Sequence, residues 1–162
     1  MPTFHNSEKA IPRPDFGKII ASLVEVENSF FPYQSVPPPK KPLLKTLIID
    51  DEDDMYYLLR NILKQRNIDT VYAGSIQEGL KVLKQNPDTY LIFLDNRLPD
   101  GLGFQYIQQF KAIANVIIVM MTAYDTSYDR KMAQNNGADD FIGKPFTKQT
   151  ILSIVDQITP EP

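Results

Sequence analysis

From Leu43 onward, the apolar residues of the chain gather into short runs that are separated by longer amphipathic stretches. Within most of these runs the apolar residues follow one another without polar alternation, which is typical of strands buried on both faces of a parallel sheet. Five strands are predicted in this way, over residues 47–49, 71–73, 91–94, 116–121 and 141–142.

A predicted helix follows each strand, and the fourth of these helices is polar and expected to be exposed. The second helix has a capping-box signature, because Ser75 is followed three residues later by Glu78. Gly137 is expected to end the fourth helix, and Thr147 to cap the fifth. The helices are predicted over residues 53–66, 75–85, 102–113, 125–136 and 147–158. Strands that alternate with helices predict an α/β domain whose parallel sheet is covered on both faces.

The first 42 residues differ in composition from the rest, because they contain eight of the thirteen prolines. This bias predicts an N-terminal extension over residues 1–42 with polyproline character, followed by a folded domain over residues 43–159. Apolar residues near helical spacing indicate a short helix around residues 15–31 of the extension. Three alternatives stay open for this helix: it docks on the folded domain, it joins another chain, or it is only partly ordered alone.

Composition and charge narrow the class of protein. The absence of Cys excludes disulfides and thiolate metal sites, which favours a reducing cytoplasm. No apolar run approaches the roughly 20 residues that a membrane span requires, so no membrane contact is expected. The net charge of −3 is too small to indicate direct binding of nucleic acid through bulk electrostatics.

Polar side chains follow or end four of the predicted strands. Asp50 and Asp51 follow the first strand, Asp95 the third, Thr122 the fourth, and Lys144 the fifth. Because the carboxyl ends of parallel strands lie at one edge of a sheet, we expect these groups to converge there. Packed carboxylates repel one another, and a hard divalent cation such as Mg²⁺ relieves that repulsion while retaining positions for a phosphate.

This combination of groups indicates phosphoryl chemistry, with a carboxylate nucleophile, a metal ion and cationic stabilisation of charge. A lysine ammonium can hold an anionic phosphoryl group, and a threonine hydroxyl can donate to it. Each residue alone has an ordinary structural interpretation as a helix start, a cap or an exposed charge. Their joint occurrence at four strand ends favours a shared site.

The strand ends carry four motifs in a fixed order, and these resemble the receiver domain of two-component response regulators over about residues 45–158. The motifs are Leu47-Ile48-Ile49-Asp50-Asp51-Glu52, Leu94-Asp95 with Pro99 and Gly103, Met121-Thr122-Ala123, and Phe141-Ile142-Gly143-Lys144-Pro145-Phe146. The resemblance implies a flavodoxin-like (βα)5 three-layer sandwich with a five-stranded parallel sheet in the order 2-1-3-4-5.

The resemblance also implies a role for each residue of the site. Asp95 would accept a phosphoryl group from the phosphohistidine of a histidine kinase or phosphotransfer protein, or from a small phosphodonor. Asp51, Asp50 through water, Asp95 and the backbone carbonyl of Arg97 would hold Mg²⁺ or Mn²⁺. Thr122 and Lys144 would bind phosphoryl oxygens. Self-phosphorylation and autodephosphorylation are then the only reactions expected, and the chain is not otherwise an enzyme.

A conformational switch is implied as well. Thr122 would move toward the phosphoryl group, Phe141 would turn inward, and the face formed by the fourth helix, fifth strand and fifth helix would change its partner preference. The Lys144–Pro145 bond is expected to be cis. From the residues alone, Phe141 reads equally well as a core aromatic. Arg97 and Tyr124 flank the site and are expected to affect how fast water reaches the acyl phosphate.

Other classes of function lack comparable support. An ordinary α/β enzyme would need a Walker loop, a Gly-x-Gly-x-x-Gly turn or a nucleophile elbow, and the chain has none of them. An aspartate-nucleophile phosphatase would carry a second Asp where Arg97 stands. A phosphorylation-independent scaffold or dimerisation module remains open, as does a receiver segment of a larger regulator. The downstream partner is accordingly a separate protein, the regulator's own output domain or a second copy of the chain.

Overall fold

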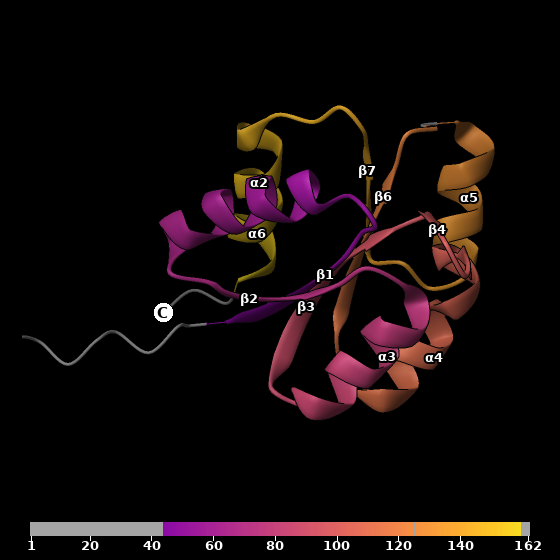
Figure 1. The fold of residues 1–162 in the computed structure, drawn as a ribbon. Coiled ribbons are helices and arrows are strands. Elements are labelled where there is room, and N and C mark those ends of the chain that lie inside the picture. The colour runs from indigo at the N-terminus through magenta and orange to yellow at the C-terminus, as the bar shows by residue number, and fades with distance from the viewer. Residues whose placement is uncertain (1–43, 125, 160–162) are drawn as a thin grey trace, which may run out of the picture. The chain divides into compact units, whose positions relative to one another are not determined.

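The computed structural model describes residues 44–124 and 126–159, so the helix predicted near residues 15–31 lies outside the described part of the chain. Its centre is a sheet of five parallel strands in the order β2-β1-β3-β6-β7 (Figure 1). Counted along the chain, this is the order 2-1-3-4-5, and the predicted fold class is confirmed. The strands are β1 (Lys45–Ile49), β2 (Asp69–Ala73), β3 (Thr89–Asp95), β6 (Ile117–Thr122) and β7 (Asp140–Gly143).

Five α-helices cover the two faces of this sheet (Figure 1). They are α2 (Asp53–Leu63), α3 (Ile76–Gln85), α4 (Ile107–Ile113), α5 (Ser127–Asn135) and α6 (Lys148–Ile158). Buried side chains of α2 and α6 join one core cluster, and those of α3, α4 and α5 join another. The sheet is therefore the middle layer of three, as the alternation of strands and helices predicts.

Side chains of the central strands alternate between the two cores. In β3, Leu91 and Phe93 belong to the core under α2 and α6, whereas Ile92 and Leu94 belong to the core under α3 and α4. All four are fully buried. The continuous apolar run of this strand is thus explained by burial on both faces, which places Asp95 at the point where the strand emerges from the core.

Some predicted helices begin or end differently in the structure. The helix expected over residues 102–113 starts with a 3₁₀ turn, Gly103–Tyr106, before α4. Leu102 is not helical, because it belongs to β5 (Gly101–Leu102), which pairs antiparallel with β4 (Arg97–Leu98). The helix expected over residues 53–66 ends as α2 at Leu63 and continues as a 3₁₀ turn over Lys64–Arg66.

The capping residues explain where three helices begin. Ser75 Oγ accepts from the Glu78 N–H at 3.2 Å, and Thr147 Oγ1 accepts from the Thr150 N–H at 3.1 Å. The capping box at Ser75 is only half formed, because the Glu78 carboxylate accepts from the Gly74 N–H instead of the Ser75 N–H. The fourth helix begins at Ser127 with Thr126 as its cap, two residues later than predicted.

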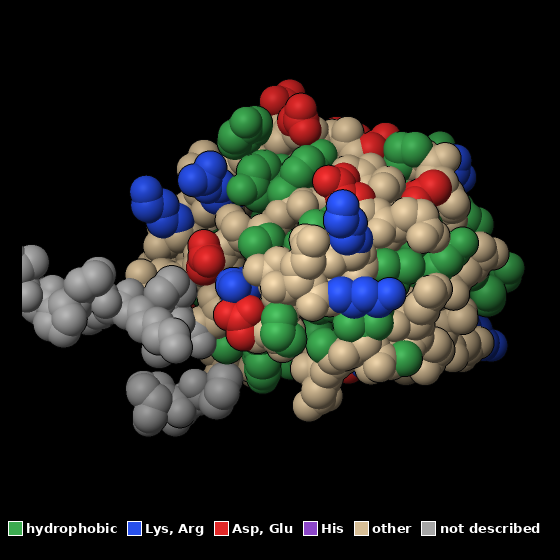
Figure 2. Space-filling model, turned by 60° about the horizontal axis from the view of Figure 1, so that its bottom comes forward, with side chains coloured by type: hydrophobic (Ala, Val, Ile, Leu, Met, Phe, Trp, Pro, Cys, Tyr) green, Lys and Arg blue, Asp and Glu red, His purple; other side chains and the backbone are tan. Residues whose placement is uncertain are grey.

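The outer surface near α3 and α4 is mixed in character. In the view that brings this part of the domain forward, charged side chains of both signs lie scattered between apolar and uncharged ones (Figure 2). No helix within residues 44–124 and 126–159 is long and apolar enough to cross a membrane.

Candidate functional site

The register of the sheet brings the predicted site residues to one edge. Asp95 is the last residue of β3 and pairs with Met121, and Thr122 is the last residue of β6 and pairs with Gly143. Lys144 follows β7 directly. The carboxyl ends of these strands therefore lie side by side, and the polar side chains at or just after them share one edge of the sheet.

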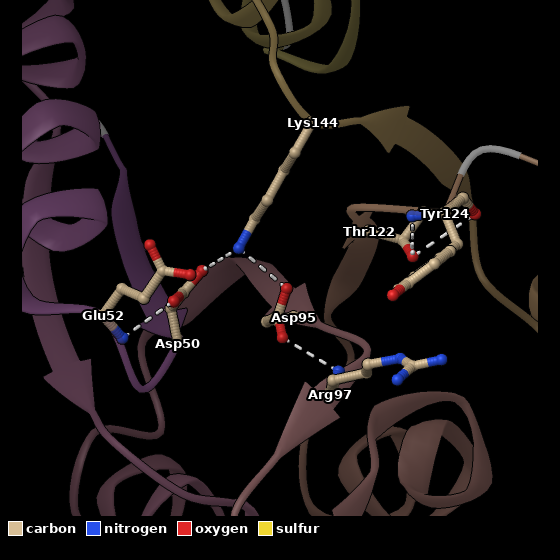
Figure 3. Close-up of polar contacts among 7 residues, drawn as sticks. All are labelled: Asp50, Glu52, Asp95, Arg97, Thr122, Tyr124 and Lys144. Carbon is tan, nitrogen blue, oxygen red and sulfur yellow. Dashed lines mark hydrogen bonds and ion pairs between the residues drawn. The ribbon is translucent and has the colours of Figure 1, made fainter.

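The ammonium group of Lys144 joins two carboxylates at this edge (Figure 3). Its Nζ donates to Asp50 Oδ2 at 2.7 Å and forms an ion pair with Asp95 Oδ1 at 2.8 Å. The side chains are 13% exposed for Lys144, 0% for Asp50 and 8% for Asp95. The Lys144–Pro145 peptide bond is cis. Three residues that are distant in the sequence thus form one buried ionic cluster.

The second oxygen of each carboxylate accepts a backbone N–H. Asp50 Oδ1 accepts from Glu52 at 3.0 Å, and Asp95 Oδ2 accepts from Arg97 at 2.8 Å (Figure 3). Both carboxylates are therefore fixed in orientation by the loop that follows their own strand.

Burial and the ion pairs have opposite effects on the pKa values of Asp95 and Lys144. Burial raises the pKa of the Asp95 carboxyl, Lys144 lowers it, and the nearby Asp50 raises it again, so that the pKa lies above its ordinary value. Burial lowers the pKa of Lys144, but its bonds to Asp50 and Asp95 outweigh this, and the pKa is raised. Lys144 is therefore protonated, and one positive charge is shared between two buried carboxylates.

Gly103 closes the loop behind Asp95. A Cβ at this position would collide with the backbone carbonyl oxygen of Asp95 and would lie 3.1 Å from Leu94 Cγ. The Gly103 N–H donates to the carbonyl of Asn96 at 2.9 Å. A side chain at residue 103 would push the loop away from the end of β3, which gives a physical reason for glycine here.

Thr122 lies at the same edge, with its hydroxyl turned to its own loop. Its Oγ1 accepts from the Tyr124 N–H at 3.1 Å and donates to the Tyr124 carbonyl at 3.4 Å (Figure 3). Thr122 is 2% exposed, whereas half of the Tyr124 surface is exposed. The guanidinium of Arg97 lies 4.2 Å from the centre of the Tyr124 ring, so the two residues predicted to flank the site are in contact.

Phe141 in β7 is half-buried and packs against the core on the side of α3 and α4. The guanidinium of Arg130 lies 4.9 Å from the centre of its ring. Both residues line a cavity of about 300 Å³ between α5 and β7. Phe141 is thus neither a fully buried core residue nor an exposed one.

Asp51 is exposed and does not join the ionic cluster. Among residues 44–124 and 126–159, no three acidic or histidine side chains stand together in a group that could hold a metal ion. The donor chemistry nevertheless fits a hard cation, because Asp50 and Asp95 offer carboxylate oxygens and share only one ammonium.

Sequence reasoning did not identify the role of Asp100. In the sequence it is the middle residue of a Pro-Asp-Gly turn between Asp95 and Gly103. In the structure its two carboxylate oxygens accept from the N–H groups of Ile76 and Gln77, both at 2.9 Å. No local pattern signals this contact, because its partners are more than twenty residues away.

Comparison with known proteins identifies the family. The family model of the response regulator receiver domain matches residues 46–156, which is more than half of the chain. The chain therefore belongs to the response regulator receiver domain family. Its domain is a phosphorylation-dependent signalling receiver and not a conventional enzyme.

One curated relative and two solved structures illustrate the likeness. The transcriptional regulatory protein YxdJ of Bacillus subtilis is 33% identical over 97 residues, which cover 59% of this chain and 42% of that protein. A two-component response regulator from Clostridium difficile superposes with a TM-score of 0.68 at 29% identity, over 71% of this chain and 94% of that one.

The second structure is a response regulator from Burkholderia pseudomallei that contains a phosphorylated aspartic acid and a calcium ion. It is 24% identical, with a TM-score of 0.63 over 68% of this chain and 65% of that one, and this likeness shows the fold. The chain spans less than half the length of the curated relatives it matches.

Proposed function

We propose that Asp95 is the phosphoacceptor of this receiver and takes a phosphoryl group from a phosphohistidine of a histidine kinase or phosphotransfer protein. The observation that carries the proposal is the ionic cluster at the sheet edge, in which Lys144 contacts both Asp50 and Asp95. A carboxylate that ends a central strand and faces a fixed ammonium is suited to act as a nucleophile toward phosphorus.

The transfer step follows from this arrangement. An Asp95 carboxylate oxygen attacks the phosphorus, the new P–O bond forms an acyl phosphate, and the P–N bond to the donor breaks with its electron pair left on the donor nitrogen. Lys144 stays protonated beside the transferred group and offsets the charge of its oxygens. The Arg97 N–H keeps the carboxylate oriented during the attack.

A divalent cation, Mg²⁺ or Mn²⁺, would be held by Asp50, Asp51, Asp95 and the backbone carbonyl of Arg97, with Asp51 turned inward from its exposed position. When bound, the ion supplies positive charge to the phosphoryl oxygens. Two carboxylates that share one ammonium retain excess negative charge, and this supports a cation site. The calcium ion in the Burkholderia response regulator supports a divalent ion of this kind.

The switch is proposed to start at Thr122. Its hydroxyl would exchange the backbone of Tyr124 for a phosphoryl oxygen, and Phe141 would then turn inward from its half-buried position. The α5–β7–α6 face would change its partner preference as the population shifts between two states.

The whole protein is proposed to be a response regulator, with residues 43–159 as its receiver and residues 1–42 as an extension. Curated relatives such as YxdJ are transcriptional regulatory proteins of more than twice the matched length. The partner that binds the α5–β7–α6 face would be an output domain of the same protein, a separate protein or a second copy of the chain. Direct contact of this segment with nucleic acid is not proposed.

Intact-protein mass spectrometry after incubation with Mg²⁺ and acetyl phosphate, or with a phosphorylated histidine kinase, tests the proposal. We expect the mass of one phosphoryl group to be added to the wild type and to be missing in Asp95→Asn. Asp156→Asn is a matched control, because Asp156 lies on the surface of α6 and should leave the adduct unchanged. An adduct that persists in Asp95→Asn would place the phosphoryl group on another residue and overturn the assignment. No adduct with any donor would also overturn it, and would favour a phosphorylation-independent scaffold.

A further inference from the structure

The loop that follows Asp95 is hydrogen-bonded to the N-terminus of α3. Asp100, at the turn of the β4–β5 hairpin, accepts from the Ile76 N–H through Oδ1 and from the Gln77 N–H through Oδ2, both at 2.9 Å. These are the first two N–H groups of α3. The bond therefore joins two segments that follow different strands of the sheet.

Asp100 completes the N-terminus of α3. The third N–H of the helix, from Glu78, is accepted by Ser75 Oγ at 3.2 Å. Burial raises the pKa of the Asp100 carboxyl, but the N–H groups of Gln77 and Ile76 outweigh this effect, and the pKa lies below its ordinary value. The carboxylate is thus ionised at neutral pH and strengthens both bonds.

The same hairpin sets the orientation of the Asp95 carboxylate. Its first strand begins at Arg97, whose N–H donates to Asp95 Oδ2 at 2.8 Å. Arg97 pairs with Leu102 and Leu98 pairs with Gly101, so the turn and this N–H belong to the same short hairpin. The hairpin therefore carries both the bonds of Asp100 to α3 and the bond of Arg97 to Asp95.

We infer that Asp100 is a positioning residue for phosphoryl transfer: by fixing the β4–β5 hairpin on the N-terminus of α3, it holds the Arg97 backbone against the Asp95 carboxylate. The inference rests on the proposed function of Asp95. The hairpin would also position the Arg97 carbonyl, the proposed ligand of the cation, because this carbonyl belongs to the same short strand.

A purely structural role for Asp100 would be to cap α3 and nothing more. Ser75 distinguishes the two roles, because it caps the same helix. Within the part of the chain that the structure describes, no hydrogen bond joins Ser75 to the hairpin. Ser75→Ala therefore weakens the helix terminus alone. Asp100→Ala weakens the terminus and also frees the hairpin, and Asp100→Asn retains one acceptor for the two N–H groups.

Amide hydrogen exchange on the protein without metal or phosphodonor provides the first test. We expect exchange at Arg97 and Gly103, relative to Phe93 in the central strand, to be about fivefold faster in Asp100→Ala, as the loss of one net hydrogen bond implies. Asp100→Asn should lie between this variant and the wild type, and Ser75→Ala should leave the ratio unchanged. Equal ratios in Asp100→Ala and wild type, or equal changes in Asp100→Ala and Ser75→Ala, would overturn the inference.

The rate of adduct formation at saturating acetyl phosphate and Mg²⁺ provides the second test. We expect Asp100→Ala to be about fivefold slower than wild type, with Asp100→Asn partly restored and Ser75→Ala unchanged. A wild type that forms no adduct would refute the proposed function, and the exchange test would then still decide whether Asp100 fixes the hairpin. A wild type that reacts at the same rate as Asp100→Ala would refute the inference and leave the proposed function standing.

Discussion

Two ion pairs of the domain have the same length and different surroundings. Lys144 Nζ lies 2.7 Å from Asp50 Oδ2 at the carboxyl edge of the sheet, and Arg66 Nε lies 2.7 Å from Asp156 Oδ1 on the surface. The Asp50 side chain is fully buried, whereas the Arg66 and Asp156 side chains are 42% and 49% exposed. Equal distances therefore do not imply equal consequences.

The difference lies in what remains when one partner is removed. Without Arg66, the carboxylate of Asp156 is hydrated, and little is lost. Without Lys144, two carboxylates remain out of contact with water and without a counter-charge, which is costly. The buried lysine between two acids therefore indicates a functional site, because burying these charges is costly. The exposed pair gives no such indication.

Lys144→Gln should have the largest effect on stability. We expect the free energy of unfolding at pH 7 to fall by about 3 kcal/mol, because the variant leaves Asp95 and Asp50 buried without a cation. Urea denaturation measures this loss. A change below the error of the measurement would show that water already reaches the two carboxylates.

The pH dependence of the same variant has a definite sign. Burial raises the pKa of Asp95, and Lys144 opposes that rise in the wild type. In Lys144→Gln the folded-state pKa of Asp95 is therefore higher still above its unfolded value. The contribution of Asp95 to the stability of the variant should be fully present below its unfolded pKa and should be lost as the pH rises through its folded pKa, which urea denaturation at a series of pH values measures.

Gly103→Ala should have the second largest effect. Its Cβ would collide with the backbone carbonyl of Asp95, which cannot move without displacing the end of β3, and we expect a loss of about 2 kcal/mol. Gly74→Ala is the matched control, because the nearest atom to its Cβ would be Tyr72 Oη at 3.4 Å, an ordinary contact. Thermal unfolding of both variants measures the difference, and similar midpoints would show that the loop behind Asp95 yields easily.

The sequence predicted the sheet because its signal is strong and local. Four apolar residues in a row, as in Leu91–Leu94, have few alternatives to a strand buried on both faces, and parallel strands necessarily end at one edge. Asp50, Asp95 and Lys144 were placed at that edge by the same argument, and the structure brings them into contact.

Contacts that involve the loops could not be predicted from the sequence. The bonds from Asp100 to α3 and the stacking of Arg97 on Tyr124 join residues whose separation leaves no periodic pattern. Asp51 was expected at the shared edge and is instead exposed, which the sequence could not show because an exposed acid and a site acid look alike in a run of five acidic residues. The β4–β5 hairpin was visible only as its Pro99-Asp100-Gly101 turn.

Asp100→Asn should have a smaller effect, which depends on pH. The folded-state pKa of Asp100 lies below its ordinary value of 3.8, so the carboxylate stabilises the fold above that value. This stabilisation should be lost as the pH falls through the folded pKa. Loss of a helix cap costs about 1 kcal/mol. Denaturation between pH 7 and pH 2 should show the difference between Asp100→Asn and wild type disappear at the acid end, and a constant difference would contradict the prediction.

Arg66→Gln should have the smallest effect of the four substitutions. Its bond to Asp156 lowers the pKa of that carboxyl, but both groups are open to water, which screens their interaction. We expect a change in urea midpoint close to the error of the measurement at low ionic strength, and none at high salt. Lys144→Gln measured in parallel should retain most of its loss at high salt, because its partners are buried. If salt abolished both effects equally, the contrast between the buried and the exposed pair would be wrong, and the ionic cluster would have to be regarded as an ordinary surface feature.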